Sequence, residues 1–198
     1  MIVTILDTET TGLDLLQHEV IEVGMMRVHV DKNWNHSQIE SFEAKIKPRF
    51  IKRAAPQALK VNGYTSEKWK KAIHFDKISF KVTEWIEDSD YLIGQNLLFD
   101  YNFINKMFDD LSLDRPKYPR YYDTKWMADK LVKEGKLKRS ALDYLCENYK
   151  IPVIGRAHTA LTDVMRTFEL FNKLRNEVKL ESLSFKKPYD PFGDQKNG

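Results

Sequence analysis

The spacing of apolar residues changes near residue 75, and this change restricts the fold more than any other feature of the sequence. Before it, β-branched or alternating runs at 2–6, 20–30 and 39–46 are typical of strands, the last of them half buried. After it, residues 91–94 predict one more strand, and apolar residues recur with helical spacing at Ile78, Val82, Trp85 and Ile86. This order predicts an α/β domain whose mixed sheet is flanked by helices.

Further helices are expected in the second half of the chain. Asn96 is placed to cap a helix that holds Phe99 and Phe103, and Thr159 to cap the last strong helix. Two other helices are expected near 124–133 and 140–149. Residues 54–71 show poor periodicity, so only short helical turns are expected there.

Length and composition fit a single domain. With 198 residues the chain can bury a core without staples, and the lone Cys146 excludes an internal disulfide and a thiolate zinc site. We expect a domain over residues 1–176 and a flexible tail over 177–198, where prolines and glycines replace the apolar pattern. The sequence shows neither a signal peptide nor a run of about 18 apolar residues, so we expect a cytoplasmic protein without a membrane segment.

Two acids follow the first expected strand. Asp7 and Glu9 are two residues apart, so strand geometry directs both side chains to the same face. Carboxylates placed this way repel each other unless they share a cation or a proton. An acid pair at a strand end is more often simply solvated, so the pair gains weight only in combination with other residues.

Two later segments supply such residues. Asp100 lies one turn into a helix that begins beside an apolar strand, although acids near helix N-termini also serve the helix dipole. His158 precedes the last helix, where it can move, and Asp163 lies one turn inside that helix, where it is fixed. This division suits a mobile proton acceptor and a rigid metal ligand.

Three segments together resemble a known family. LDTETTGL at 6–13, IGQNLLFD at 93–100 and HTALTD at 158–163 are similar to the three motifs of the DEDDh, or DnaQ-like, exonucleases. That family includes proofreading subunits of replicative polymerases and RNA-trimming enzymes. Asp123-Thr124 and residues 140–145 add weaker similarity, and the resemblance covers about residues 2–175. Gln95 departs from the pattern, because members often have histidine there.

The resemblance implies a ribonuclease-H-like fold and assigns roles to individual residues. Metal ligands and catalytic acids are expected at Asp7, Glu9, Asp100 and Asp163, and His158 is expected to be the general base. Main-chain groups near Thr8 to Thr11 are expected to bind a free 3′ hydroxyl, and Leu13 to wedge against the terminal base. The full set expected to contact substrate is Thr8, Thr10, Thr11, Gly12, Leu13 and Asn96.

Four clustered carboxylates also suit the chemistry of phosphodiester hydrolysis. Two divalent ions can hold the phosphate, generate hydroxide and stabilise the leaving oxygen, and their charge balances that of four carboxylates. Hard oxygen ligands select Mg²⁺ or Mn²⁺ over softer metals. The carboxylates alone would equally suit an endonuclease. The resemblance to the DEDDh exonucleases implies a two-metal 3′–5′ exonuclease that releases nucleoside 5′-monophosphates.

The substrate and partners are less restricted. We favour DNA, in a proofreading or repair role, with single-stranded or frayed 3′ ends as the substrate. An RNA-trimming exoribonuclease and a catalytically idle nucleic-acid-binding module on the same fold are the alternatives. Leu183 and Phe185 in the expected tail are candidates for docking a DNA polymerase or a sliding clamp.

Positive charge is concentrated between Lys45 and Lys71. This segment holds nine basic residues against the single acid Glu67, a net charge of +8. A basic segment with interspersed aromatic residues is able to follow phosphates and stack bases, and a solvated surface is the alternative. The aromatic residues concerned are Phe50, Tyr64 and Trp69.

Overall fold

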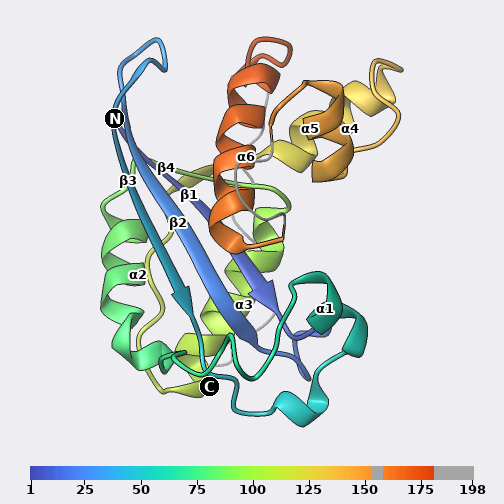
Figure 1. The fold of residues 1–198 in the computed structure, drawn as a ribbon. Coiled ribbons are helices and arrows are strands. Elements are labelled where there is room, and N and C mark those ends of the chain that lie inside the picture. The colour runs from blue at the N-terminus through green and yellow to red at the C-terminus, as the bar shows by residue number, and fades with distance from the viewer. Residues whose placement is uncertain (153–157, 181–198) are drawn as a thin grey trace, which may run out of the picture.

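The computed structural model describes residues 1–152 and 158–180, whose strands form one five-stranded mixed sheet. Figure 1 shows how helices surround it. The strand order is β3-β2-β1-β4-β5. The strands β1 (Ile2–Thr10), β2 (Val20–Val30) and β3 (His36–Lys45) form an antiparallel meander. The strands β4 (Tyr91–Gly94) and β5 (Arg120–Asp123) continue the sheet parallel to β1. The expected mixed sheet is confirmed.

Helices cover both faces of this sheet (Figure 1). One face carries α2 (Ser79–Glu87) and α3 (Leu97–Asp110), and the other carries α4 (Thr124–Lys133), α5 (Leu142–Asn148) and α6 (Ala160–Leu174). The segment between β3 and α2 contains the short helices η1 (Ile51–Arg53), α1 (Pro56–Val61) and η2 (Phe75–Lys77). Within the described residues, no helix is both long and apolar enough to cross a membrane.

The two faces have separate cores because successive strand residues point to opposite sides. On β4, Leu92 packs with α2 and α3, whereas Ile93 packs with the α6 side. On β1, Val3 and Ile5 face α6, and Leu6 faces the other core. This alternation fixes which face of β1 carries each residue that follows Leu6.

Three sequence-based expectations differ from the structure. The edge strand β3 is exposed over its first half, including Ile39 at 50%, whereas Phe42, Ala44 and Ile46 face the core with the expected alternation. The four-residue strand β5 was not expected. Val178 is buried in the α6-side core, so packing continues beyond residue 176. The remainder of the expected tail, residues 181–198, lies outside the described residues.

The cap of α3 also differs from the expectation. Asn96 occupies the N-cap position in a left-handed conformation, but its side chain forms no capping bond. Asp123 instead accepts hydrogen bonds from the backbone amides of Asn96, at 2.9 Å, and Leu97, at 3.0 Å. The same carboxylate accepts from the amide of Lys125, at 2.9 Å, and caps α4. One buried acid therefore ties two helices to the end of β5.

Candidate active site

The first two acids of the site extend the inward row of β1. Asp7 and Glu9 follow Val3 and Ile5 with strand spacing, so they point to the α6 side of the sheet. Asp7 is paired with Gly24 of β2, and a bulge interrupts the ladder directly after Glu9. The apolar row thus ends in two carboxylates where the sheet stops being regular.

Close packing of α6 on β2 brings in the third acid. A Cβ atom on Gly24 would lie 2.4 Å from the backbone carbonyl carbon of Ala160, so only glycine admits this approach. Glu22 accepts a hydrogen bond from the amide of Ala160 at 3.1 Å, and Thr159 caps the helix through its side chain, as expected. Asp163 is consequently fixed in the first turn of α6.

Three carboxylates meet at this point. One oxygen from each of Asp7, Glu9 and Asp163 lies within 4.8 Å of the others. Three hard oxygen donors at this spacing fit a divalent cation such as Mg²⁺ better than a softer metal. The chemistry of the donor set therefore agrees with a metal site.

Asp100 reaches the site from α3, on the other side of β1. Its side chain is buried, and its Oδ1 accepts hydrogen bonds from the amide of Thr8 at 2.8 Å and from the Thr8 hydroxyl at 2.7 Å. Asp100 is not one of the three residues whose oxygens lie within 4.8 Å of one another. Its negative charge nevertheless helps to raise the pKa of Asp7.

Burial makes this group of acids unfavourable without a cation. Burial is the main cause that raises the pKa of Asp7 well above its usual range, followed by repulsion from Asp100 and Glu9. Burial, with repulsion from Asp163, raises the pKa of Glu9 to about 8. Burial also raises the pKa of Asp100 to about 7, against the opposing hydrogen bonds from Thr8. Either protons or metal ions must neutralise the site near neutral pH.

One basic side chain is built into the site. Arg166 on α6 donates from Nη1 to Oδ1 of Asp163 at 2.8 Å and from Nη2 to Oδ1 of Asp143 at 2.6 Å. Its side chain is only 4% exposed. Sequence reasoning missed both Arg166 and Glu22, although each is a charged residue inside an otherwise apolar pattern.

His158 lies beside the acids but outside the helix. Its side chain is 41% exposed, and its Nδ1 is 4.0 Å from Oδ2 of Asp163. The backbone has a φ of 59°, in the left-handed region, immediately before the capping residue Thr159. The imidazole is thus accessible to solvent at the edge of the acidic group.

A cavity of about 410 Å³ opens next to Glu9. This volume lies within the ~300–1,000 Å³ range of small-ligand pockets. Four of the residues expected to contact substrate line the cavity, and they are Thr8, Thr10, Gly12 and Leu13. Its other wall includes Ala55, Ala58, Val61 and Asn62 from the α1 region, where the weak sequence periodicity gave no signal.

The other expected substrate contacts are placed differently. Thr11 and Asn96 are not among the lining residues of the cavity. The amide of Thr11 donates to the carbonyl of Glu19 at 2.9 Å, and the amide of Thr8 is bound to Asp100. These two amides therefore already have acceptors inside the protein.

Two aromatic residues of the basic segment serve the fold. Trp69 is buried and donates from Nε1 to the carbonyl of Ile21 at 2.8 Å, and Tyr64 packs against it. Lys45 forms an ion pair with Glu22 at 3.1 Å and lies over the Trp69 ring. The expectation that Trp69 stacks on bases is therefore wrong, because its ring is inside the protein.

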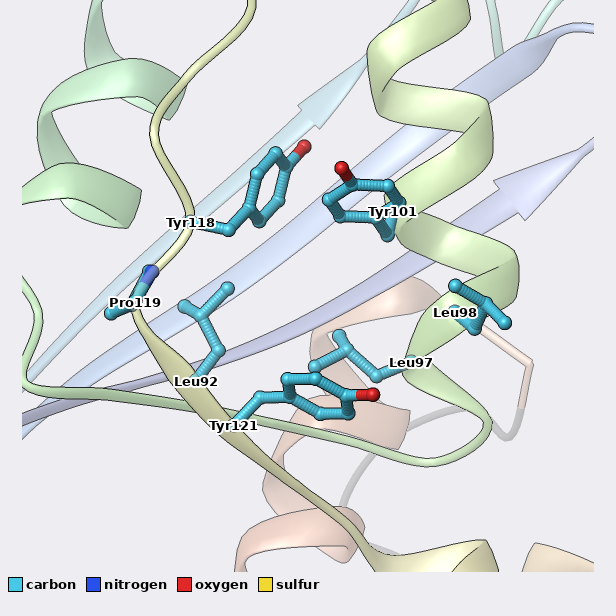
Figure 2. A pocket seen from close by; sticks show the side chains of 7 residues that line it. All are labelled: Leu92, Leu97, Leu98, Tyr101, Tyr118, Pro119 and Tyr121. Atoms are coloured by element: carbon cyan, nitrogen blue, oxygen red, sulfur yellow. The ribbon is translucent and has the colours of Figure 1, made fainter. Parts of the chain in front are cut away.

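A second hollow lies between β4, β5 and α3, and Figure 2 shows the side chains that line it. Its lining is apolar apart from three tyrosine hydroxyls, and the rings of Tyr101 and Tyr118 lie 4.2 Å apart. The space amounts to about 10 Å³, room for about one water molecule. It is too small to hold a nucleotide.

Curated relatives of the chain are bacterial DNA polymerase III proteins. DNA polymerase III subunit epsilon of Buchnera aphidicola subsp. Baizongia pistaciae is 34% identical over 169 residues, which cover 80% of this chain and 64% of the relative. The subunit epsilon of Rickettsia typhi is 33% identical and covers 84% of this chain and 71% of the relative. DNA polymerase III PolC-type of Thermotoga maritima is 28% identical, and only 12% of its length is covered.

Solved structures with the same fold include two nucleases. Escherichia coli exonuclease I in complex with a dT13 oligonucleotide has a TM-score of 0.73 at 16% identity, covering 88% of this chain and 41% of that one. The nuclease domain of 3′hExo, a DEDDh family member bound to rAMP, has a TM-score of 0.70 at 16% identity, covering 89% and 92%. These similarities establish the expected ribonuclease-H-like architecture.

A family model described as Exonuclease (RNase_T) matches residues 4–171. That range includes all three motif segments and every strand of the sheet except the first two residues of β1. The chain therefore belongs to the RNase_T exonuclease family, in agreement with its resemblance to the DEDDh exonucleases.

Proposed function

We propose that this protein is a metal-dependent 3′–5′ exonuclease that removes nucleoside 5′-monophosphates from DNA. The observation that carries the proposal is the meeting of Asp7, Glu9 and Asp163 within 4.8 Å, where Glu9 also lines a cavity of about 410 Å³. An idle binding module would have no physical need for clustered, buried and mutually repelling acids. The match to the exonuclease family also supports hydrolysis over binding alone.

The metal site is assigned to four residues. Asp7, Glu9 and Asp163 would hold a first divalent ion, and Asp100 would act with Asp7 on a second. Mg²⁺ and Mn²⁺ are the proposed ions because the ligands are carboxylate oxygens. Two such ions, when bound, supply charge neutralisation at the phosphate and an activated water.

Side chains of the protein have separate roles in proton transfer and in binding the 3′ end. His158 is exposed beside Asp163 and takes the proton of the attacking water as general base. Glu9 faces the cavity, where it accepts a hydrogen bond from a free 3′ hydroxyl. Leu13, 83% exposed at the rim, packs against the terminal base. Thr8 and Thr10 line the wall on which the sugar rests.

DNA is favoured over RNA because the curated relatives are DNA polymerase III subunits or DNA polymerase III itself. The runner-up is 3′ exoribonuclease activity, since a structural neighbour of the DEDDh family was solved with rAMP. The relatives also make a DNA polymerase the proposed protein partner. The tail residues Leu183 and Phe185, considered for docking a polymerase or clamp, lie outside the described residues.

Labelled single strands test this function. Purified protein with Mn²⁺ is expected to shorten a 5′-labelled DNA strand stepwise and to release the label of a 3′-labelled strand as a mononucleotide at once. RNA strands of the same sequence are expected to react more slowly. Faster cleavage of RNA would favour the exoribonuclease. If neither DNA nor RNA is cleaved, the catalytically idle binding module is the alternative that remains.

A further inference from the structure

Phe50 presents an aromatic ring to solvent within the basic segment. Phe50 is 47% exposed, in contrast to the buried Trp69. The guanidinium carbons of Arg53 and Arg49 lie 4.5 Å and 5.5 Å from the centre of the ring. The guanidinium groups lie over the ring, so its exposed part offers a surface for base stacking next to positive charge for phosphates.

The backbone that carries this ring is held in place by a buried acid. Glu19 is 4% exposed, and its two carboxylate oxygens accept hydrogen bonds from the amides of Arg49 at 2.9 Å and Phe50 at 2.7 Å. The amide of Thr11 is bonded to the carbonyl of Glu19. Phe50 is thus tied to the same loop that carries Gly12 and Leu13.

The segment after Phe50 leads to the substrate cavity. Following η1, the amide of Ala55 donates to the carbonyl of Thr11 at 2.7 Å, and Ala55 itself lines the cavity. Five residues of chain span at most about 18 Å, so Phe50 lies within that distance of Ala55, a reach of a few nucleotides. A strand whose last nucleotide occupies the cavity can therefore pass over Phe50.

The charge around the ring is available to a polyanion. Lys52 and Arg53 are exposed, and neither forms an ion pair within the described part of the chain. Arg49, by contrast, is engaged with Asp110 and lies near Glu19. Arg53 therefore supplies positive charge at the ring, and Lys52 adds a second exposed charge next to it in the sequence.

We propose that Phe50, Lys52 and Arg53 form a second binding site, which takes an unpaired nucleotide of single-stranded DNA upstream of the nucleotide in the cavity. Stacking on Phe50 needs a base that is free of its partner strand, so the site selects single strands over paired ends. The statement that this site lies upstream of the reacting nucleotide rests on the proposed exonuclease function, which puts the 3′ end in the cavity.

Binding without metal isolates this site from catalysis. In a chelator, the affinity for a ~10-nucleotide thymidine strand and for a thymidine dinucleotide is measured by fluorescence anisotropy. Phe50→Ala is expected to weaken binding of the longer strand about 5- to 150-fold, which corresponds to ~1–3 kcal/mol per stacked base. Dinucleotide binding is expected to stay unchanged, and Phe50→Trp to retain wild-type affinity.

Phe80→Ala is the matched control. Phe80 is 79% exposed on α2, which Figure 1 shows well apart from α1. Its substitution is expected to leave the affinity for the longer strand unchanged. Lys52→Glu with Arg53→Glu is expected to flatten the salt dependence by about 0.7 per lost phosphate contact on log–log axes. Unchanged binding in Phe50→Ala, or an equal loss in Phe80→Ala, would overturn the proposal. A length-dependent loss in a protein that cleaves nothing would support this site and reject the exonuclease function.

Discussion

Arg166 and Asp163 form a buried ion pair inside the group of acids, with Nη1 of the arginine 2.8 Å from Oδ1 of the carboxylate. Because Oδ1 is engaged in this way, Asp163 has Oδ2 left to offer a metal. The other arm of Arg166 reaches Asp143, whose side chain is 64% exposed. Arg166 is therefore a positioning residue that acts on the site through Asp163.

Arg166→Met is expected to weaken Mn²⁺ binding or turnover about 10- to 100-fold, the range found when a residue that orients a metal ligand is lost. The variant should also lose about 3–5 kcal/mol of stability, because it leaves a buried carboxylate without its partner. Calorimetric titration with Mn²⁺ measures the first effect, and Arg166→Lys should restore part of it. Wild-type Mn²⁺ affinity and turnover in Arg166→Met would show that the pair is only structural.

Asp7→Ala is expected to remove nearly all activity, since Asp7 is proposed to contact both ions. Thermal unfolding of the wild-type protein should shift upward with Mg²⁺, because a metal bound only by the folded state stabilises it. That shift should disappear in Asp7→Ala. Retention of more than about a tenth of wild-type turnover would contradict the two-metal site.

His158→Ala is expected to lower turnover about 100-fold or more while Mn²⁺ binding stays near normal. The imidazole is 4.0 Å from Asp163 and is assigned to the water, not to the metal. If the substitution abolishes Mn²⁺ binding instead, the histidine is a ligand and its assigned role is wrong.

Stability of the metal-free protein is expected to fall as pH rises from about 5 to 8. The pKa values of Glu9, about 8, and Asp100, about 7, lie above the ordinary carboxyl value of about 4. In this range the folded protein keeps protons that the unfolded chain has released, so stability present at low pH is lost as these acids ionise.

Thermal unfolding in a chelator at several pH values measures this loss. Glu9→Gln with Asp100→Asn should flatten the dependence, since neither replacement titrates. Saturating Mn²⁺ should reduce it, because the metal binds the ionised acids. A metal-free unfolding midpoint that rises steadily over the same range would contradict the assigned pKa shifts.

The local pattern was sufficient to predict most of the fold. Strand β2 matches the expected 20–30, and α6 begins after Thr159 as expected, because long apolar periods and a capping residue are local signals. Strand β5 was missed because four residues are too few to show a period. Asn96 was assigned a capping bond that Asp123 makes, since a cap from a residue 27 positions away leaves no local trace.

The site shows the same limit. The motif acids were identified because a resemblance placed them, and the structure brings Asp7, Glu9 and Asp163 together. Glu22 was not identified, because its contact with the amide of Ala160 exists only where α6 packs against β2. Arg166 was overlooked although Asp163 lies three residues away in the same helix, and its second partner, Asp143, comes from α5. Trp69 was misjudged because composition alone does not distinguish an aromatic residue that faces solvent from one inside the core.

A circular single-stranded DNA tests the central claim most directly. The account requires a free 3′ end, so protein with Mn²⁺ should leave the circle intact while it degrades a linear strand of the same sequence. A 3′-phosphate on the linear strand should slow that degradation severely. Cleavage of the circle by wild-type protein, absent from Asp7→Ala purified in parallel, would contradict the account and make the site that of an endonuclease.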